Sequence, residues 1–203
     1  MKSDIKIIFW DFDGVLINSN PIRDLGFEDC LSNFPKYQVE QLLSFHKSNG
    51  GLSRYVKFRY FFEKIRNEIV SEEIILDYAN SFSLLMREKL VDKKLLIDTN
   101  IEFIKNNYKK YQFHITSGSD QNELRYLCNE LDISKYFISI NGSPTPKNDL
   151  IKQLLIFYNY DRLNCLLIGD SYNDYQASRL NGIYFKSYNG SKELDSLSNC
   201  DFI

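Results

Sequence analysis

Two carboxylates stand one residue apart at Asp11 and Asp13, directly after an apolar run and directly before Gly14. The apolar run, residues 5–10, predicts a buried strand, and the glycine predicts that the chain turns at its end. Carboxylates this close repel one another unless a cation or a shared proton offsets their charge. Because Mg²⁺ favours carboxylate oxygen and water, the pair indicates either a magnesium site or a shared proton, with a plain polar turn as the alternative.

Further polar groups follow apolar runs later in the chain, at the ends of predicted strands and at the start of a predicted helix. They are Thr116, Ser117, Gly118, Lys147, Asp170 and Asp174. The carboxyl ends of parallel strands share one edge of a sheet, so these groups can converge on Asp11. Carboxylates, a hydroxyl, an ammonium and free amides suit Mg²⁺ together with a phosphoryl group, and a carboxylate can attack phosphorus to form an aspartyl-phosphate.

The elements that must position these groups alternate between strands and helices after residue 92. Strands are predicted at 111–116, 137–140, 165–168 and 183–185, and helices at 101–108, 123–131, 150–158 and 175–180. This alternation is typical of βαβ units, so we expect an α/β fold with a Rossmann-like, three-layer parallel sheet. The serine and asparagine residues near the C-terminus predict a loosely ordered tail.

Residues 19–92 contain no convincing strand and predict an all-helical insertion after the first strand. Pro21 suits the first turn of a helix. Apolar residues at three- and four-residue spacing predict an amphipathic helix over 55–69 and another over 74–90. Ser71 is the expected N-cap of the later helix, because acidic residues that suit a helix start follow it.

The composition limits the classes of function. The 203 residues are 43% apolar with a formal net charge of −2, which allows one large domain or a core with an insertion. The absence of a basic surplus argues against nucleic acid or an acidic membrane as a partner. Four scattered cysteines indicate reduced thiols in a cytoplasmic protein, and no run reaches the roughly 20 apolar residues of a membrane span. We expect a monomer or a homodimer.

The order of the motifs is Asp-x-Asp-Gly-Val-Leu, a strand with Thr-Ser-Gly, a lysine, and Gly-Asp-Ser-x-x-Asp. This order resembles that of the haloacid dehalogenase-like (HAD) superfamily of hydrolases. The helical insertion is similar to the C1-type cap of the phosphoglycolate phosphatase and β-phosphoglucomutase group. The resemblance implies a catalytic core of residues 1–18 and 93–203 and a cap of residues 19–92.

The same resemblance implies roles for the four aspartates. Asp11 resembles the nucleophile that accepts the phosphoryl group and also contacts Mg²⁺. Asp13 resembles the acid/base that protonates the leaving oxygen and then activates water, while its backbone carbonyl touches the metal. Asp170 is the expected Mg²⁺ ligand, directly or through water, and Asp174 completes or orients that shell. An acid at position 13 favours phosphoryl chemistry over dehalogenation.

The phosphoryl oxygens are expected to be bound by one hydroxyl and two amides, those of Thr116, Ser117 and Gly118. The family's charge-balancing lysine is expected where Ser143 stands, which is a departure from the pattern. We expect Lys147 to reach the same place from a helix start, with Lys152 as the substitute and a solvated lysine as the alternative.

Gly51, Arg54 and Lys57 in the cap are candidate substrate contacts. Arg54 and Lys57 are three residues apart and share a helix face, although a solvated outer face is equally compatible with that spacing. Together these features predict a Mg²⁺-dependent phosphatase acting on a small phosphorylated metabolite such as a sugar phosphate. A phosphomutase and a non-catalytic binding protein on the same scaffold remain alternatives. A receiver domain also groups Asp, Thr and Lys, but it is shorter and has no insertion.

Overall fold

The computed structural model describes residues 4–200 and contains a five-stranded parallel sheet with the strand order β3-β2-β1-β4-β5. The strands are β1 (Ile7–Trp10), β2 (Gln112–Asp120), β3 (Ser139–Ser143), β4 (Cys165–Gly169) and β5 (Tyr184–Ser187). β1 lies in the centre and pairs with β2 on one side and β4 on the other. The order of the strands reverses at β1, which is where open α/β sheets bind ligands.

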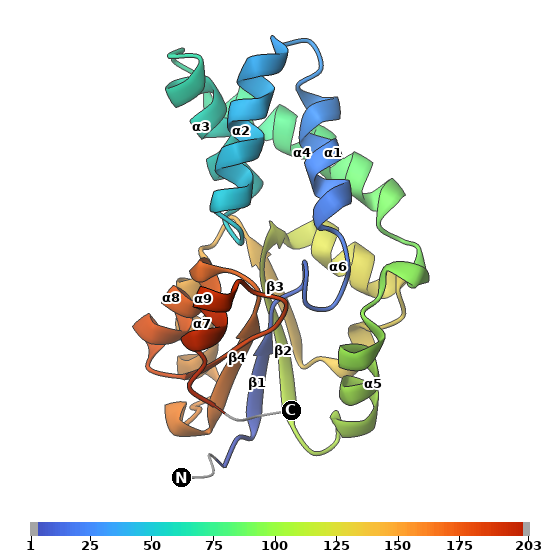
Figure 1. Cartoon of the computed structure of the whole chain (residues 1–203). Helices are drawn as coiled ribbons and strands as arrows, with labels where there is room; N and C mark the ends of the chain where they lie inside the picture. The colour runs from blue at the N-terminus through green and yellow to red at the C-terminus, as the bar shows by residue number, and fades with distance from the viewer. Residues whose placement is uncertain (1–3, 201–203) are drawn as a thin grey trace.

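Helices cover both faces of the sheet (Figure 1). They are α5 (Asp98–Asn107), α6 (Gln121–Glu130), α7 (Lys147–Phe157) and α8 (Tyr172–Asn181). Side chains alternate along β1, so Ile8 and Trp10 pack in the same apolar cluster as α5 and α6, whereas Ile7 and Phe9 pack with α7 and α8. The predicted three-layer α/β fold is therefore confirmed.

All of the regular structure described between β1 and β2 before residue 92 is helical, as predicted. The helices are α1 (Asn20–Cys30), α2 (Lys36–Ser48), α3 (Arg54–Tyr60), the π-helical turn Phe61–Ile65, and α4 (Glu72–Lys89). Pro21 lies in the first turn of α1, and the Ser71 side chain accepts a hydrogen bond from the amide of Ile74 at the start of α4. Figure 1 shows this helical block above the carboxyl edge of the sheet.

Aromatic side chains hold the helical block together. The ring of Phe27 on α1 lies 5.3 Å from that of Phe58 on α3 and 4.5 Å from that of Phe82 on α4, measured between centroids. All three are at most 2% exposed. Aromatic pairs at this spacing are stabilised by about 1 kcal/mol beyond their burial, so these rings hold the three helices together. They belong to the same apolar cluster as Ile8 and Trp10 of β1.

The helix predicted over 55–69 ends earlier than expected. The amide of Arg66 bonds to the carbonyl of Phe61, five residues back, and Asn67 has a positive φ of 53°, which ends the helix. Ile69, whose spacing fits the apolar face, is instead fully exposed. The spacing of apolar residues predicts too long a helix, because it cannot detect the local turn that ends the helix.

The loosely ordered tail is a second prediction that the structure corrects. Within the described residues the chain forms α9 (Lys192–Ser196), capped by Ser191, and then returns to β5. The amide of Phe185 donates to the Asn199 side chain at 2.7 Å, and the amide of Asn199 donates to the Phe185 carbonyl at 3.1 Å. Polar residues therefore pair with the edge strand rather than remaining unstructured. Residues 201–203 of the tail lie outside the described residues.

Several short elements and single residues complete the description. Three 3₁₀ turns connect the larger elements, at Lys93–Leu95, Ser134–Tyr136 and Arg162–Asn164. His114 is fully buried in β2, as expected of a sheet residue. Its ring contacts the Ser139 hydroxyl at 2.7 Å and the Tyr160 hydroxyl at 2.9 Å. No helix between residues 4 and 200 is long and apolar enough to cross a lipid bilayer.

Candidate active site

A tight turn follows β1 and brings the motif carboxylates to the edge of the sheet. The amide of Asp11 bonds to the carbonyl of Ile168 on β4 at 2.9 Å, so the pairing of the strands continues to the first carboxylate. Gly14 then adopts a positive φ of 76°, and a Cβ atom there would lie 2.0 Å from Asp170 Oδ2. The glycine is required twice over, by the turn and by the close approach of Asp170.

Three carboxylates meet at the ends of β1 and β4. One oxygen from each of Asp11, Asp170 and Asp174 lies within 4.8 Å of the others. Lys147, the first residue of α7, places Nζ 2.8 Å from Asp11 Oδ1 and also bonds to Asp174 Oδ1. The structure thus places Lys147 beside the predicted nucleophile, whereas the side chain of Lys152 is exposed.

The electrostatics of this cluster fit a divalent cation. Burial, reinforced by Asp174, raises the pKa of Asp11 well above its usual value, with Lys147 opposing the shift. Burial and Asp174 likewise raise the pKa of Asp170 to about 7. Three clustered carboxylates with one lysine leave excess negative charge, and carboxylate oxygens in such a cluster suit Mg²⁺. Asp174 has both oxygens occupied, by Lys147 and by the amide and hydroxyl of Ser171, so it is better placed to orient the site than to bind the ion.

Asp13 lies apart from the three-carboxylate cluster and accepts three hydrogen bonds. Ser19 Oγ and Arg23 Nε each donate to Asp13 Oδ1 at 2.5 Å, and Ser119 Oγ donates to Oδ2 at 2.6 Å. Burial alone would raise the pKa of Asp13, but the charge of Arg23 and the two serine hydrogen bonds lower it on balance. In this conformation Asp13 is held as a carboxylate.

The residues predicted to bind phosphoryl oxygens lie along the end of β2. Thr116 Oγ1 is buried and has no hydrogen-bond partner among the described residues, which leaves it available to a ligand. Ser117 uses its own hydroxyl to accept from the amide of Ser119 at 3.1 Å. The absence of a side chain at Gly118 lets the cap approach, because a Cβ atom there would lie 2.1 Å from the carbonyl oxygen of Gly51.

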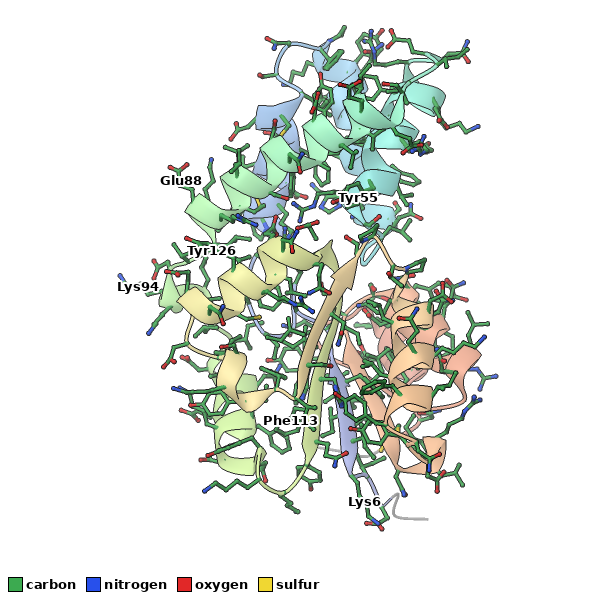
Figure 2. The ribbon with its side chains drawn as sticks, turned by 180° about the vertical axis from the view of Figure 1, so that it is seen from behind. Lys6, Tyr55, Glu88, Lys94, Phe113 and Tyr126 are labelled. Atoms are coloured by element: carbon green, nitrogen blue, oxygen red, sulfur yellow. The ribbon has the colours of Figure 1, made fainter. Side chains whose placement is uncertain are left out.

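The helical block lies over the carboxyl edge of the sheet, and the two line a cavity of about 460 Å³. Asn173 Nδ2 donates to the Gly51 carbonyl at 3.1 Å, and the Tyr55 hydroxyl donates to Asp120 Oδ2 at 2.8 Å. Tyr55, labelled in Figure 2, lies where α3 meets the end of the sheet. A cavity of this size suits a small ligand rather than a polymer.

The candidate cap residues all line this cavity. Gly51, Arg54 and Lys57 contribute to its wall, and the side chains of Arg54 and Lys57 are only 4% exposed. The solvated outer face that their spacing also allowed is therefore wrong. Arg54 Nη1 donates to Glu123 Oε2 at 2.5 Å and to the Ser83 hydroxyl at 2.8 Å.

Sequence reasoning missed Ser19, Arg23, Ser119 and Glu123. Arg23 links Asp13 to Glu123, because its Nη1 donates to Glu123 Oε1 at 3.0 Å. Glu123 is a charged residue, yet it is fully buried. The sequence predicts only that it lies in a helix over 123–131. Two signals were available: Ser19 and Arg23 follow the Asp13 motif by six and ten residues, and Glu123 immediately precedes the apolar face of α6.

This fold and this arrangement of strand-end carboxylates define a class of α/β hydrolases, and comparison with known proteins identifies the family. The family model described as haloacid dehalogenase-like hydrolase matches residues 5–182. The chain therefore belongs to the haloacid dehalogenase-like hydrolases, which confirms the family predicted from the motifs. A search of curated proteins found no match.

Solved structures share the fold. A predicted phosphoglycolate phosphatase from Haemophilus somnus superposes with a TM-score of 0.72 at 19% identity, covering 91% of this chain and 85% of the other. CbbY from Rhodobacter sphaeroides, in complex with xylulose-1,5-bisphosphate, gives 0.75 at 13% identity, with coverages of 97% and 92%. β-Phosphoglucomutase from Clostridium difficile gives 0.74 at 17% identity, with coverages of 97% and 89%.

Proposed function

We propose that this protein is a Mg²⁺-dependent phosphatase that hydrolyses a small phosphomonoester through an aspartyl-phosphate. One observation carries the proposal: Asp11 and Asp170 belong to one acidic cluster and line the cavity, and Lys147 forms an ion pair with Asp11. The bound cation would be held by Asp11, Asp170 and the Asp13 carbonyl, and it would neutralise charge on the phosphoryl group. HAD-like hydrolases generally use a divalent metal, which agrees with this acidic cluster.

The reaction would proceed in two steps. In the first, Asp11 attacks phosphorus, the bond to the leaving oxygen breaks, and a proton from Asp13 neutralises that oxygen. In the second, Asp13 takes a proton from water, whose oxygen attacks phosphorus and releases inorganic phosphate from Asp11. The three hydrogen bonds to Asp13 favour the carboxylate, the form from which the second step starts, but they also weaken it as a base. Donation in the first step requires those bonds to loosen.

The phosphoryl oxygens would be bound by Thr116 Oγ1 and by the amides of Ser117 and Gly118, with Lys147 balancing the charge on Asp11. These contacts lie on the core, which we assign to residues 1–18 and 93–203. The cap, residues 19–92, would exclude water and contribute Gly51, Arg54 and Lys57 to the substrate pocket. The meeting of Gly51 with Gly118 and Asn173 supports a closed cap.

The experiment is hydrolysis of p-nitrophenyl phosphate with Mg²⁺, with EDTA, and with Mg²⁺ restored after EDTA. We expect turnover that EDTA abolishes and Mg²⁺ restores. A panel of phosphorylated metabolites assayed for released phosphate then selects the substrate class. Absence of phosphate release from every compound at saturating Mg²⁺ would contradict the proposal and favour a non-catalytic binding protein.

A phosphomutase is the second candidate, because β-phosphoglucomutase shares the fold. It would form the same aspartyl-phosphate but return the phosphoryl group to a second hydroxyl of the substrate. ³¹P NMR of a sugar monophosphate separates the two outcomes. Inorganic phosphate indicates the phosphatase, and a new phosphomonoester signal at constant total ester indicates the mutase.

A further inference from the structure

The segment that follows β5, residues 188–197, lies beyond the part of the chain that the family model matches, which ends at residue 182. Figure 1 shows α9, which belongs to this segment, below the helical block. The cavity that Asp11 and Asp170 line is also lined by four residues of the segment, Ser191, Glu193, Leu194 and Leu197. The wall of the candidate active site therefore includes residues outside the family match.

The first two residues of this segment connect two turns of the site. The amide of Tyr188 donates to the Gly169 carbonyl at 2.9 Å, directly before Asp170 in the chain. Asn189 Nδ2 donates to the Gly14 carbonyl at 3.3 Å, directly after Asp13. One short stretch of chain thus bonds to the turn after β1 and to the turn after β4, and these turns follow the strands that deliver the clustered carboxylates.

The turn after β1 already touches Asp170, so its position matters for the acidic cluster. A Cβ atom at Gly14 would lie 2.0 Å from Asp170 Oδ2. The Gly14 carbonyl is also one residue beyond the Asp13 carbonyl, which we expect to contact the cation. A rotation of this turn would therefore move that carbonyl and change its distance from Asp170, and the hydrogen bond from Asn189 opposes such a rotation.

The residue that donates this hydrogen bond is itself held in place. Asn189 has a positive φ of 54°, in the left-handed region that asparagine tolerates better than most residues. On one side of it, the Tyr188 hydroxyl lies 3.0 Å from Thr99 Oγ1. On the other side, the amide of Leu194 donates to Ser191 Oγ at 3.2 Å, and Leu194 is buried. Contacts on both sides thus fix the backbone that presents the Asn189 amide to Gly14.

We propose that Asn189 is a positioning residue for the metal site, which holds the turn after β1 against Asp170 in the arrangement that favours Mg²⁺ over a larger cation. This inference depends on the proposed function and adds a residue to its metal site. Asn189 acts through the Gly14 peptide. Mg²⁺ demands near-ideal geometry at short ligand distances, whereas Ca²⁺ accepts longer and more variable ones. Loss of the Asn189 amide should therefore weaken Mg²⁺ binding more than Ca²⁺ binding.

The test is the Kd of each ion for the full-length protein without substrate, measured by calorimetry. Asn189→Gly keeps the left-handed backbone accessible and removes the side-chain amide. We expect its Kd for Mg²⁺ to rise at least about threefold, less than the roughly 10- to 100-fold typical of residues that bond to a metal ligand directly. The Kd for Ca²⁺ should rise by less than half as much.

Asn159→Gly is the matched control. Asn159 also has a positive φ, of 52°, and it is exposed in the turn after α7. Both substitutions therefore increase the freedom of the unfolded chain in the same way. Asn159→Gly should leave the Kd values of Mg²⁺ and Ca²⁺ unchanged, so a change seen only in Asn189→Gly is assigned to the lost hydrogen bond.

The inference is overturned if the Kd for Mg²⁺ rises by less than the expected amount in Asn189→Gly. It is also overturned if the Kd for Ca²⁺ rises half as much or more, because that result would indicate a general loosening of the turn. Failure of the wild-type protein to bind Mg²⁺ would remove this inference together with the proposed metal dependence. Hydrolysis of p-nitrophenyl phosphate is scored separately: a wild-type protein that binds Mg²⁺ but releases no phosphate removes the phosphatase, and the Kd values still decide the role of Asn189.

Discussion

The cavity has two walls of opposite charge, built in different ways. The core wall carries three clustered carboxylates at the ends of β1 and β4, with one lysine beside them in the described structure. The cap wall carries three buried cations on α1 and α3, and two of these share the core carboxylate Glu123. The core wall therefore carries an excess of negative charge, and the cap wall carries an excess of positive charge.

We expect the core wall to carry out the reaction and the cap wall to select the substrate. Strand ends fix the core wall, so its carboxylates stay in place whatever the cap does. The cap wall assembles only when helices meet the sheet, as the contact of Gly51 with Asn173 illustrates. We expect changes on the core wall to affect the rate with every substrate, and changes on the cap wall to affect stability and the choice of substrate.

The largest expected effect comes from Asp11→Asn. The amide cannot attack phosphorus, so p-nitrophenyl phosphate hydrolysis should fall by at least about 10³-fold. Tm should not fall, because Lys147 keeps Asp174 as its partner and the substitution removes a carboxylate charge that burial and Asp174 disfavour. Asp77→Asn, on the exposed face of α4, is the control and should keep full activity. Retention of a tenth of the activity by Asp11→Asn would assign the nucleophile elsewhere.

The core wall is the part of the site that the sequence could predict. Asp11, Asp170 and Lys147 each stand at the end of a strand or the start of a helix, and a parallel sheet brings such ends to one edge. Their convergence therefore follows from the topology of the sheet. The spacing of apolar residues along the sequence is sufficient to predict that topology. The expected lysine was displaced along the chain from Ser143 to Lys147, yet the helix start still delivered its amine to Asp11 at 2.8 Å.

The next effect tests the ion pairs of Glu123 with Arg23 and Arg54, which connect the core wall to the cap wall. Glu123→Gln leaves two buried arginines short of a counter-charge, and breaking a buried ion pair typically costs about 4 kcal/mol. We expect a loss of unfolding free energy of that size in urea denaturation. Glu130→Gln at the exposed end of the same helix should change it by less than about 0.5 kcal/mol. Equal stability of the two variants would show that the cap does not depend on Glu123.

The sequence alone could not predict these ion pairs. Arg23 and Glu123 lie 100 residues apart, so no local helix or strand period can show that they pair. Charged residues are usually exposed, so the helix predicted over 123–131 gave no reason to expect a buried carboxylate at Glu123. Arg54 and Lys57 could be selected by their three-residue spacing, but only the packing of α3 on the sheet decided between the cavity and the solvent.

Metal binding gives the third effect and isolates the core wall. Mg²⁺ at about 100 times its Kd should stabilise the wild-type protein by about 2.7 kcal/mol, measured as a rise in Tm. Asp170→Asn should be at least as stable as wild type without the ion, because burial and Asp174 raise the pKa of Asp170 to about 7, but it should gain little from Mg²⁺. Lys57→Met should respond to Mg²⁺ like the wild type. A full Mg²⁺ response in Asp170→Asn would exclude that carboxylate as a ligand.

The smallest expected effect is a change of stability with pH that depends on Lys57 in the cap wall. Burial lowers the pKa of Lys57 to about 7, with Arg23 and Arg54 adding to the shift and Asp13 and Asp24 opposing it. The amine titrates near 10.5 in the unfolded chain, so between pH 7 and 10.5 the unfolded state binds more protons and stability rises with pH. From pH 7 to 9, Lys57 should contribute a gain of about 2 kcal/mol. The gain is the difference between wild type and Lys57→Met in ligand-free denaturation curves, which cancels the titrating groups that Lys57 does not perturb. Lys64→Met should follow the wild-type curve, and parallel curves for wild type and Lys57→Met would mean that the amine already has a counter-charge, so that the two walls do not differ as described.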